Sequence, residues 1–479
     1  MNSLKPLQWV AVAAVSFAAL YLLYTHLPLF GDMTFLGGIL LLEVIIACLW
    51  KFDQRFLVLL MITFVWAGMR VPLQGAWTAG RWLVLAAGAV AGFIVWVKDP
   101  RKPFGPVHLV GFFCACAAFV SASVSPFTQM AMLKALSLSL LFLYCSAGAR
   151  AAVIGREDHF FRGLLRACEI VVYGTAICYL VLGLSIWGNP NSMGAAMSIG
   201  LFPVLLWGWL TREGTVVRFR LLCALMLCTY LVFVSSARAG MIAVMMVTLV
   251  FCFCLHQYKL LIKAVAIVLV LIAVAGVLNP RDLDKKLIDT TDELLYKGHK
   301  EQGLLGSRLS PWEKTVQTIK QHPWFGTGYG TSATGEDPGL SFGTIASSAE
   351  TAREHGSSYM TIAEWVGLLG VAPFAVLLVL TLSNVWRVCV WMNRTTNPRH
   401  YSIPLAMVVL SGVVHAGFED WLFAVGSYPC VYFWVFAFIL ADLVPQAVAV
   451  PVPGASNRSP RTLPADYGAF VPNSVLSNR

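Results

Sequence analysis

Repeated apolar runs of membrane length constrain this chain most strongly. Runs of about 18–20 residues with few charged side chains recur along the sequence, and each is long enough to cross roughly 30 Å of hydrocarbon as a helix. Hydrophobic residues make up 58% of the 479 residues and charged residues only 12%, whereas soluble domains are about 45–50% apolar and about 25% charged. Because no single soluble core accounts for this difference, we predict an all-α integral membrane protein with about 12–14 transmembrane helices.

The predicted spans cover most of the chain. The first has no small-residue cleavage site after it and is followed by another span, so we interpret it as a retained helix and not as a signal peptide. The spans lie near residues 7–24, 33–50, 54–71, 79–97, 107–124, 130–148, 167–187, 192–211, 219–235, 238–256, 260–278, 371–391, 401–418 and 421–443.

Basic residues indicate how these spans cross the membrane. They collect in alternate inter-helix loops, and this asymmetry keeps one sign along the whole chain, as the positive-inside rule requires. The net charge of +10 is therefore a topology signal and does not indicate nucleic-acid binding. Both termini are predicted to be cytoplasmic. The basic loops hold Lys51 and Arg55; Lys98, Arg101 and Lys102; Arg150, Arg156, Arg162 and Arg166; Arg212, Arg218 and Arg220; Lys259 and Lys263; Arg387, Arg394 and Arg399.

One polar stretch divides the chain into regions. Residues 279–357 are too rich in charged side chains for a bilayer to host, so we predict a large loop there, on the outer side of the membrane. Residues 1–278 form about eleven transmembrane helices, and residues 358–444 form a re-entering segment and the C-terminal helices. Residues 445–479 are Pro-rich without periodicity, which predicts a disordered cytoplasmic tail.

Short amphipathic helices are expected within this loop. Ser310-Pro311-Trp312-Glu313 is a good helix start, since Ser310 can cap, Pro311 suits the first helical position and Glu313 can complete a capping box. Trp312, Val316 and Ile319 then share one face, and His322-Pro323 ends the helix. We expect this helix to lie on the membrane surface.

Two familiar kinds of site are excluded. Trp324-Phe325-Gly326-Thr327-Gly328-Tyr329-Gly330 follows a helix, lacks the Lys-Ser/Thr of a nucleotide-binding phosphate loop, and has the wrong spacing for a dinucleotide fingerprint. The twelve cysteines contain no CxxC pair and lie almost entirely within apolar runs. They are expected to be small buried hydrophobic residues, without a disulfide framework or a metal site.

The predicted topology gathers the unusual polar residues on the outer face. Arg238 falls at the outer end of two spans joined by almost no loop, and Lys134 lies about one turn inside the outer end of its helix. Ionisable groups at membrane depth are functional candidates by default. The other candidates are Asn191 at an outer helix break, Arg308, Arg353, Glu354 and His355 in the large loop, and His415, Glu419 and Asp420 at the outer turn between the last two spans.

Each candidate also has an ordinary explanation. An Arg at a helix end is commonly an anchor to the membrane interface, Asn189-Pro190-Asn191 is first a helix breaker, and Glu419-Asp420 suits a solvated turn. Convergence on one face, in a chain with so few charges, favours a functional site. We expect Arg238, Arg308 and His355 to lie outside the apolar core.

The residue types suit one chemistry. Arginine presents a planar fork of donors that can hold a pyrophosphate bidentately without losing its charge. Two or three such groups at the membrane surface would bind a lipid pyrophosphate and stabilise it as a leaving group, with no metal required. A nearby histidine can take the proton from an attacking sugar hydroxyl. This combination needs no cofactor.

At these residues the chain resembles the O-antigen ligase and polymerase superfamily of bacterial envelope glycosyltransferases. No single motif is specific, but their order, spacing and placement around one outer loop are, and the core similarity spans about residues 185–390. The matching pieces are Ser235-Ser236-Ala237-Arg238-Ala239-Gly240, Gly306-Ser307-Arg308-Leu309-Ser310-Pro311-Trp312, His322-Pro323-Trp324-Phe325-Gly326-Thr327-Gly328-Tyr329-Gly330, His355-Gly356-Ser357-Ser358-Tyr359 and Glu364-Trp365-Val366-Gly367-Leu368-Leu369-Gly370.

The resemblance implies a function at the periplasmic face of the bacterial inner membrane. A glycan linked to undecaprenyl pyrophosphate would be transferred to an acceptor glycan or to lipid A-core, without a nucleotide sugar or a metal. Arg238 and Arg308 would bind the donor pyrophosphate, and His355 would activate the acceptor. The family commonly has His-Asn before the re-entering helix, where this chain has His355-Gly356.

Other functions remain open on the sequence. The superfamily includes ligases, polymerases and protein O-glycosylating enzymes, and the short tail slightly favours the first two because it offers no extra acceptor-binding domain. A lipid-linked glycan flippase would use the same arginines in a central cavity open alternately to both sides. The one-sided placement of the polar residues and the lack of a visible internal repeat favour an enzyme over a flippase. A non-catalytic assembly partner is a third alternative.

Overall fold

The structure is a computed structural model, and it describes residues 56–70, 74–98, 103–259, 262, 306–332 and 355–445. The chain divides into two units, Met1–Pro445 and Gln446–Arg479, and the described residues all lie in the first. The predicted spans near 7–24, 33–50 and 260–278, much of the predicted loop, and the predicted disordered tail lie outside these residues.

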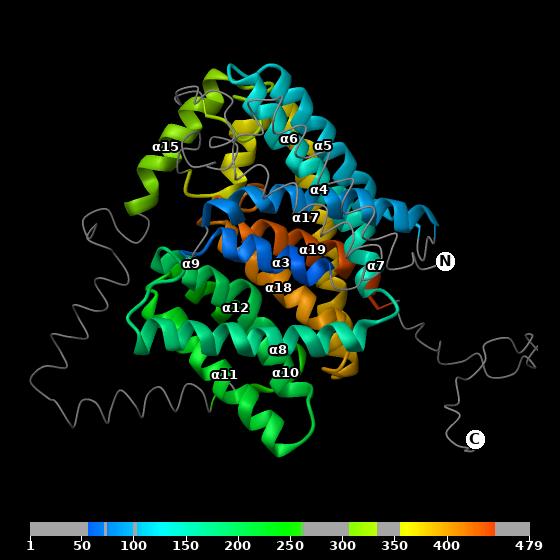
Figure 1. Cartoon of the computed structure of the whole chain (residues 1–479), viewed down its shortest axis with the longest axis vertical. Coiled ribbons are helices and arrows are strands. Elements are labelled where there is room, and N and C mark those ends of the chain that lie inside the picture. Colours follow the sequence, from blue (N-terminus) through cyan, green and yellow to red (C-terminus); the bar gives the residue numbers. More distant parts are fainter. Residues whose placement is uncertain are drawn as a thin grey trace, which may run out of the picture. The chain divides into compact units, whose positions relative to one another are not determined.

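All regular elements among the described residues are helices (Figure 1). Seven of them are long and apolar enough to cross a membrane, and four shorter apolar helices accompany them, which confirms an all-α integral membrane protein. The helices are α3 (Phe56–Ala67), α4 (Gln74–Lys98), α5 (Pro106–Ser123), α6 (Thr128–Tyr144), α7 (Arg150–Val153), α8 (Glu157–Ala176), α9 (Pro190–Ala195), α10 (Phe202–Thr211), α11 (Thr215–Val234), α12 (Arg238–Cys254), α15 (Gly306–Gln321), α17 (Ser358–Thr395), α18 (Ser402–Ala416) and α19 (Tyr428–Leu443).

Three π-helical turns extend these helices. Cys145–Ala149 joins α6 to α7, Ile177–Val181 continues α8, and Ala196–Leu201 joins α9 to α10. Each join makes one continuous span, so Thr128–Val153, Glu157–Val181 and Pro190–Thr211 each have membrane length. Asn189 caps the start of α9 by accepting a hydrogen bond from the Ser192 N–H at 2.7 Å, as expected of a helix breaker followed by a new start.

Several span boundaries differ from the sequence prediction. The span predicted near 371–391 extends over Ser358–Thr395, and two other differences have a clear local cause. The span predicted near 167–187 begins ten residues earlier, at Glu157, because α8 opens with two acidic residues in its first turn and continues as a half-buried amphipathic helix. Acidic side chains stabilise a helix N-terminus, but they interrupt the apolar run by which a span is recognised. The last span begins at Tyr428 and not at residue 421, because residues 417–427 form a folded loop.

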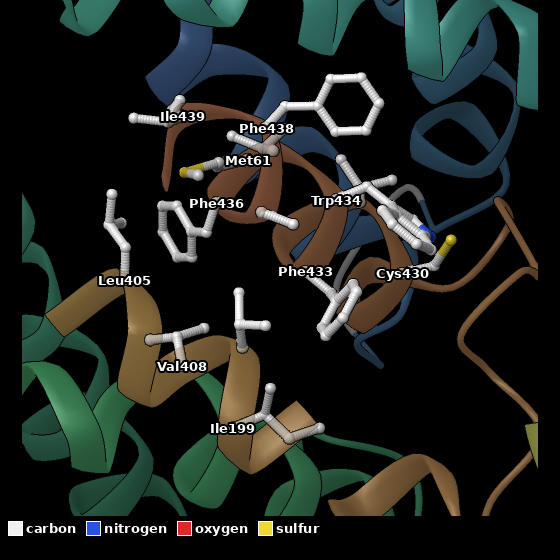
Figure 2. Packing of buried hydrophobic residues seen from close by; sticks show 14 of the residues in the cluster. Met61, Ile199, Leu405, Val408, Cys430, Phe433, Trp434, Phe436, Phe438 and Ile439 are labelled. Atoms are coloured by element: carbon white, nitrogen blue, oxygen red, sulfur yellow. The ribbon is translucent and has the colours of Figure 1, made fainter. Parts of the chain in front are cut away.

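The core is centred on α18 and α19, which are buried along almost their whole lengths. Figure 2 shows Leu405 and Val408 of α18 pointing toward the α19 side chains Phe433 and Phe436. The Phe438 ring stacks on Phe142 of α6 at 5.5 Å between centroids. A helix that is apolar on all sides must be surrounded by protein or lipid, and here protein surrounds it.

Arg150 shows that not every predicted loop cation is solvated. Its side chain is buried and binds both carboxylate oxygens of Asp442, one of them at 3.0 Å. The same guanidinium donates to the Ser146 carbonyl oxygen at 3.1 Å. This bidentate pair ties α7 to the end of α19.

Candidate active site

A break in α17 forms the base of the site. Gly367 has φ 65° and ψ −177° inside the helix, so the backbone groups on either side lose their helical partners. The Pro323–Gly328 segment replaces them. Leu368 N–H donates to the Pro323 oxygen at 2.8 Å and Leu369 N–H to the Trp324 oxygen at 3.2 Å. In return, Thr327 N–H donates to the Glu364 oxygen at 3.0 Å and Gly328 N–H to the Trp365 oxygen at 3.1 Å.

Gly326 and Gly328 of this segment pack too closely against neighbouring atoms to carry a side chain. Gly326 has φ 73°, and a Cβ there would lie 2.4 Å from the Glu364 carbonyl oxygen. Gly328 has φ 108°, and its Cβ would lie 2.2 Å from the Cβ of Ser125. No side chain fits either contact, and both backbone conformations favour glycine. The glycines thus allow the Pro323–Gly328 segment to hydrogen-bond to the broken part of α17.

The neighbouring helix α15 begins earlier than predicted. It starts at Gly306, so Ser310 is not its cap and Pro311 lies inside it. Pro311 lacks one N–H donor, and near the helix start this removes only one intrahelical hydrogen bond. The helix ends at Gln321, immediately before His322-Pro323 as predicted. Its buried face carries Thr315 and Thr318, whereas Val316 is exposed. That the helix lies on the membrane surface stays a prediction.

His355 lies between two carboxylates at the start of α17. Its Nε2 is 3.2 Å from Glu364 Oε1, and its Nδ1 is 3.3 Å from Asp420 Oδ2. Its backbone N–H also donates to Asp420 Oδ2 at 3.0 Å. His355 is only 1% exposed and Glu364 is fully buried, whereas the Asp420 side chain is 31% exposed. The expectation that His355 lies outside the core is therefore wrong.

The carboxylates control the charge of this histidine. Burial alone would lower the pKa of His355, but the hydrogen bonds and the negative charges of Asp420 and Glu364 outweigh it, so its pKa is raised above 6.5. For Asp420, burial opposes ionisation, but the hydrogen bonds and charge of His355 lower its pKa. The two carboxylates thus stabilise the imidazolium form of His355.

The His355-Gly356-Ser357-Ser358-Tyr359 motif positions the loop that carries Asp420. Ser358 N–H and Oγ–H both donate to the Glu419 carbonyl oxygen, at 3.0 and 2.6 Å. Tyr359 Oη–H donates to the Val413 oxygen at 2.6 Å. Gly356 has φ 71°, a left-handed conformation that asparagine also tolerates, so glycine suits the position where the family commonly has asparagine.

Two arginines lie beside the histidine group. Arg308, in the first turn of α15, forms an ion pair with Glu419 at 2.5 Å, and both side chains are mostly buried. A Cβ on Gly356 would lie 3.2 Å from Arg308 Cδ, so Arg308 lies directly against the motif that carries His355. Arg238 begins α12, separated by three residues from the end of α11, and is close enough to Arg308 for their positive charges to repel. The structure therefore brings Arg238, Arg308, His355, Glu419 and Asp420 together.

The secondary candidates have different surroundings. Lys134 of α6 donates to the Gly330 oxygen at 2.7 Å, which places it beside the glycine segment. His415 is 2% exposed, and its Nδ1 accepts a hydrogen bond from Trp421 Nε1 at 3.0 Å, so that nitrogen is unprotonated. Asn191 is exposed at the start of α9. Arg353 and Glu354 lie outside the described residues.

A cavity of about 450 Å³ opens beside the histidine group. His355, Asp420 and Trp365 line one part of it, and α6, Trp82 of α4, Tyr329, Gly330 and the loop of residues 421–427 line the rest. Lys134 is the basic side chain of this lining. The cavity thus joins a charged end to an apolar end. In the described residues, no group of three or more His, Cys, Asp or Glu side chains is arranged to hold a metal ion. Metal independence itself stays a prediction.

Sequence reasoning missed two residues of this site. Glu364 was identified only as part of a family motif, although a carboxylate inside a predicted membrane segment is a signal in its own right. Ser358 was likewise identified only as part of a family motif, because its role depends on Glu419, 61 residues further along the chain.

Fold and site together define a multi-pass, all-helical membrane protein with a cationic, histidine-carboxylate centre at one end of its helices. Residues 221–354 match the family model described as O-antigen ligase. This match confirms the resemblance to the O-antigen ligase superfamily over residues 221–354. A search of curated proteins finds no matching relative. The matched segment contains Arg238 and Arg308 and ends one residue before His355.

The family match supports a general activity. It indicates a glycosyltransferase-type enzyme of polysaccharide biosynthesis, of the O-antigen ligase or polymerase kind, acting on glycan substrates at a lipid bilayer.

Proposed function

We propose that this protein transfers a glycan from undecaprenyl pyrophosphate to an acceptor hydroxyl at the periplasmic face of the bacterial inner membrane. The observation that carries the proposal is the meeting of Arg238 and Arg308 with the His355 group at one end of the helices. Both termini would be cytoplasmic, and residues 279–357 would face the periplasm. The partners are the lipid-linked donor, an acceptor glycan or lipid A-core, and the bilayer.

The arginines suit the donor. Two guanidinium groups that repel each other gain stability when an anion lies between them. A pyrophosphate offers several oxygens to both forks at once. The ion pair with Glu419 at 2.5 Å orients the Arg308 guanidinium before the donor binds. Preorganised hydrogen-bond donors are most effective where charge develops in the transition state.

The histidine group suits the acceptor. The acceptor oxygen attacks the anomeric carbon of the donor sugar, and the bond from that carbon to the pyrophosphate oxygen breaks. The acceptor proton goes to Nδ1 of neutral His355, on the side of the cavity, while Nε2–H donates to Glu364. The departing pyrophosphate keeps the electron pair beside the arginines. Glu364, buried at 3.2 Å from Nε2, holds the ring and stabilises the imidazolium that forms, while the partly exposed Asp420 faces the cavity.

One reconstitution tests the proposal against its alternatives. Purified protein in lipid nanodiscs is mixed with lipid-linked glycan and either lipid A-core, a second lipid-linked glycan or an acceptor protein. Transfer without a nucleotide sugar supports the proposal, and the productive acceptor distinguishes ligase, polymerase and protein glycosylation. Movement of the lipid-linked glycan across the bilayer without transfer would instead support a flippase.

A further inference from the structure

A second cavity lies away from the active site. It measures about 680 Å³ and is formed by α3, α8, the α9–α10 span and α19, which can be followed in Figure 1. We call it the α3–α8 groove, and its walls include Ile62 and Trp66 of α3, Leu164 of α8 and Tyr432 of α19. It shares no lining residue with the cavity beside His355.

The α3–α8 groove is apolar along its length and basic at one end. The α8 stripe that lines it runs from His159 to Val171, a distance of roughly 18 Å at the helical rise, and Arg156 immediately precedes α8. Arg156 and His159 are the charged or titratable side chains of the lining apart from Cys and Tyr. They lie at the start of α8, near the first residues of α18, because Tyr401 Oη donates to Asp158 at 3.0 Å.

This basic end is opposite to the active site. Tyr401 immediately precedes α18, whereas His415, which is close enough to Arg308 to interact with its charge, lies in the last turn of the same helix. A helix of this length separates its ends by roughly 20 Å. The α3–α8 groove therefore reaches the opposite membrane surface from the one that the His355 group occupies.

Two glycines keep the α3–α8 groove open. A Cβ added to Gly163 of α8 or to Gly200 of the α9–α10 span would meet nothing within 4 Å. Both glycines line the cavity. A larger side chain at either position would therefore extend into the empty volume and not into neighbouring backbone.

We propose that the α3–α8 groove binds one anionic phospholipid, with an acyl chain along the apolar stripe and the phosphate at Arg156 and His159. The apolar walls match the acyl chain, and the basic end matches a headgroup with net negative charge. A zwitterionic headgroup carries its own cation, which Arg156 repels. The proposal does not depend on the transfer reaction, since it concerns a different cavity whose basic end lies at the other end of the helices.

Native mass spectrometry tests this directly. The full chain is purified in detergent, stripped of lipid and titrated with phosphatidylglycerol or phosphatidylcholine. We expect one phosphatidylglycerol to bind in preference to phosphatidylcholine. Arg156→Ala should weaken that binding about fivefold, the effect of about one basic group near a lipid surface. Gly163→Phe should abolish it by filling the groove.

Arg162→Ala is the matched control. Arg162 is on the same helix, but it is exposed, pairs with Asp158 and does not line the groove. It should bind phosphatidylglycerol as the parent protein does. Thermal unfolding of each lipid-free variant shows whether it is folded; if Gly163→Phe is not, Gly200→Phe tests the opposite wall. Equal binding of the two lipids, or binding that survives in folded Arg156→Ala and groove-filling variants, would overturn the proposal.

Discussion

Glu364→Gln offers the sharpest test of the histidine group. Glu364 is fully buried, and its Oε1 is 3.2 Å from His355 Nε2. Glutamine keeps the shape and a hydrogen-bonding oxygen but removes the negative charge. Asp420 remains beside the other ring nitrogen, Nδ1, so the imidazole keeps one of its two carboxylate partners. The substitution therefore changes chiefly the electrostatic environment of His355.

The magnitude follows from the loss of this charge. An opposite charge in direct contact shifts a pKa by about 1–3 units, and each unit corresponds to about 1.4 kcal/mol. Glu364 raises the pKa of His355, so its removal should lower that pKa by about 1–3 units. The same energy stabilises the imidazolium formed during transfer, so the maximal rate should fall about 10- to 1,000-fold.

The sign of the pH dependence is fixed by the role of the histidine. A general base works only when neutral, so transfer by the parent protein should rise as pH increases through a His355 pKa above 6.5. In Glu364→Gln this rise should move to lower pH. Initial rates of transfer in nanodiscs over about pH 5–9 measure both effects. Glu419→Gln is the control for the pH shift alone, because Glu419 pairs with Arg308 and not with His355; its rate should fall, but its pH profile should stay close to that of the parent.

Stability gives a readout that does not need activity. A raised folded-state pKa contributes stability that is fully present below the unfolded-state value of about 6.5 and is lost as pH rises through the folded value. The difference in thermal midpoint between parent and Glu364→Gln should therefore be largest at acidic pH and shrink at alkaline pH. An unshifted or upward-shifted rate profile, with an unchanged maximal rate, would refute the reasoning.

Four further outcomes are expected. Arg238→Lys and Arg308→Lys should each lower transfer by about 100- to 1,000-fold, because a point charge lacks the bidentate fork; parent-like rates in both Arg→Ala variants would count against the transferase assignment. His355→Ala should abolish transfer while donor binding, measured by retention of lipid-linked glycan, is nearly unchanged; parent-like transfer would exclude His355 as the base. Labelling tests the predicted topology. On a cysteine-depleted background, a membrane-impermeant thiol reagent in intact cells should modify Lys320→Cys and spare Asn393→Cys, both at exposed positions. The reverse pattern would overturn the predicted membrane topology. Gly326→Ala should lower the thermal midpoint markedly, because the added Cβ would lie 2.4 Å from backbone atoms and the residue has φ 73°. Gly163→Ala should be tolerated, because Gly163 is exposed and a Cβ there meets nothing within 4 Å.

The sequence alone determined the class of this protein and the candidates for its site. Apolar runs of this length are expected to cross a bilayer as helices, because a helix satisfies all of its backbone hydrogen bonds within one segment. A strand would need a closed barrel to do the same. The sequence therefore predicted the helices, and the scarcity of charge drew notice to Arg238, Arg308, His355 and Asp420. Local signals also located the end of α15 at His322-Pro323, which depends only on neighbouring residues.

Tertiary structure decided which of these residues meet and in what state. Glu364 became a partner of His355 only because the break at Gly367 and the Pro323–Gly328 segment hold that turn of α17 in place. Asp420 reaches the same ring because Ser358 binds the loop that carries it. Whether a histidine is buried, and between which charges, depends on segments distant in the chain, and burial and neighbouring charge are what set its pKa. No local pattern contains that information.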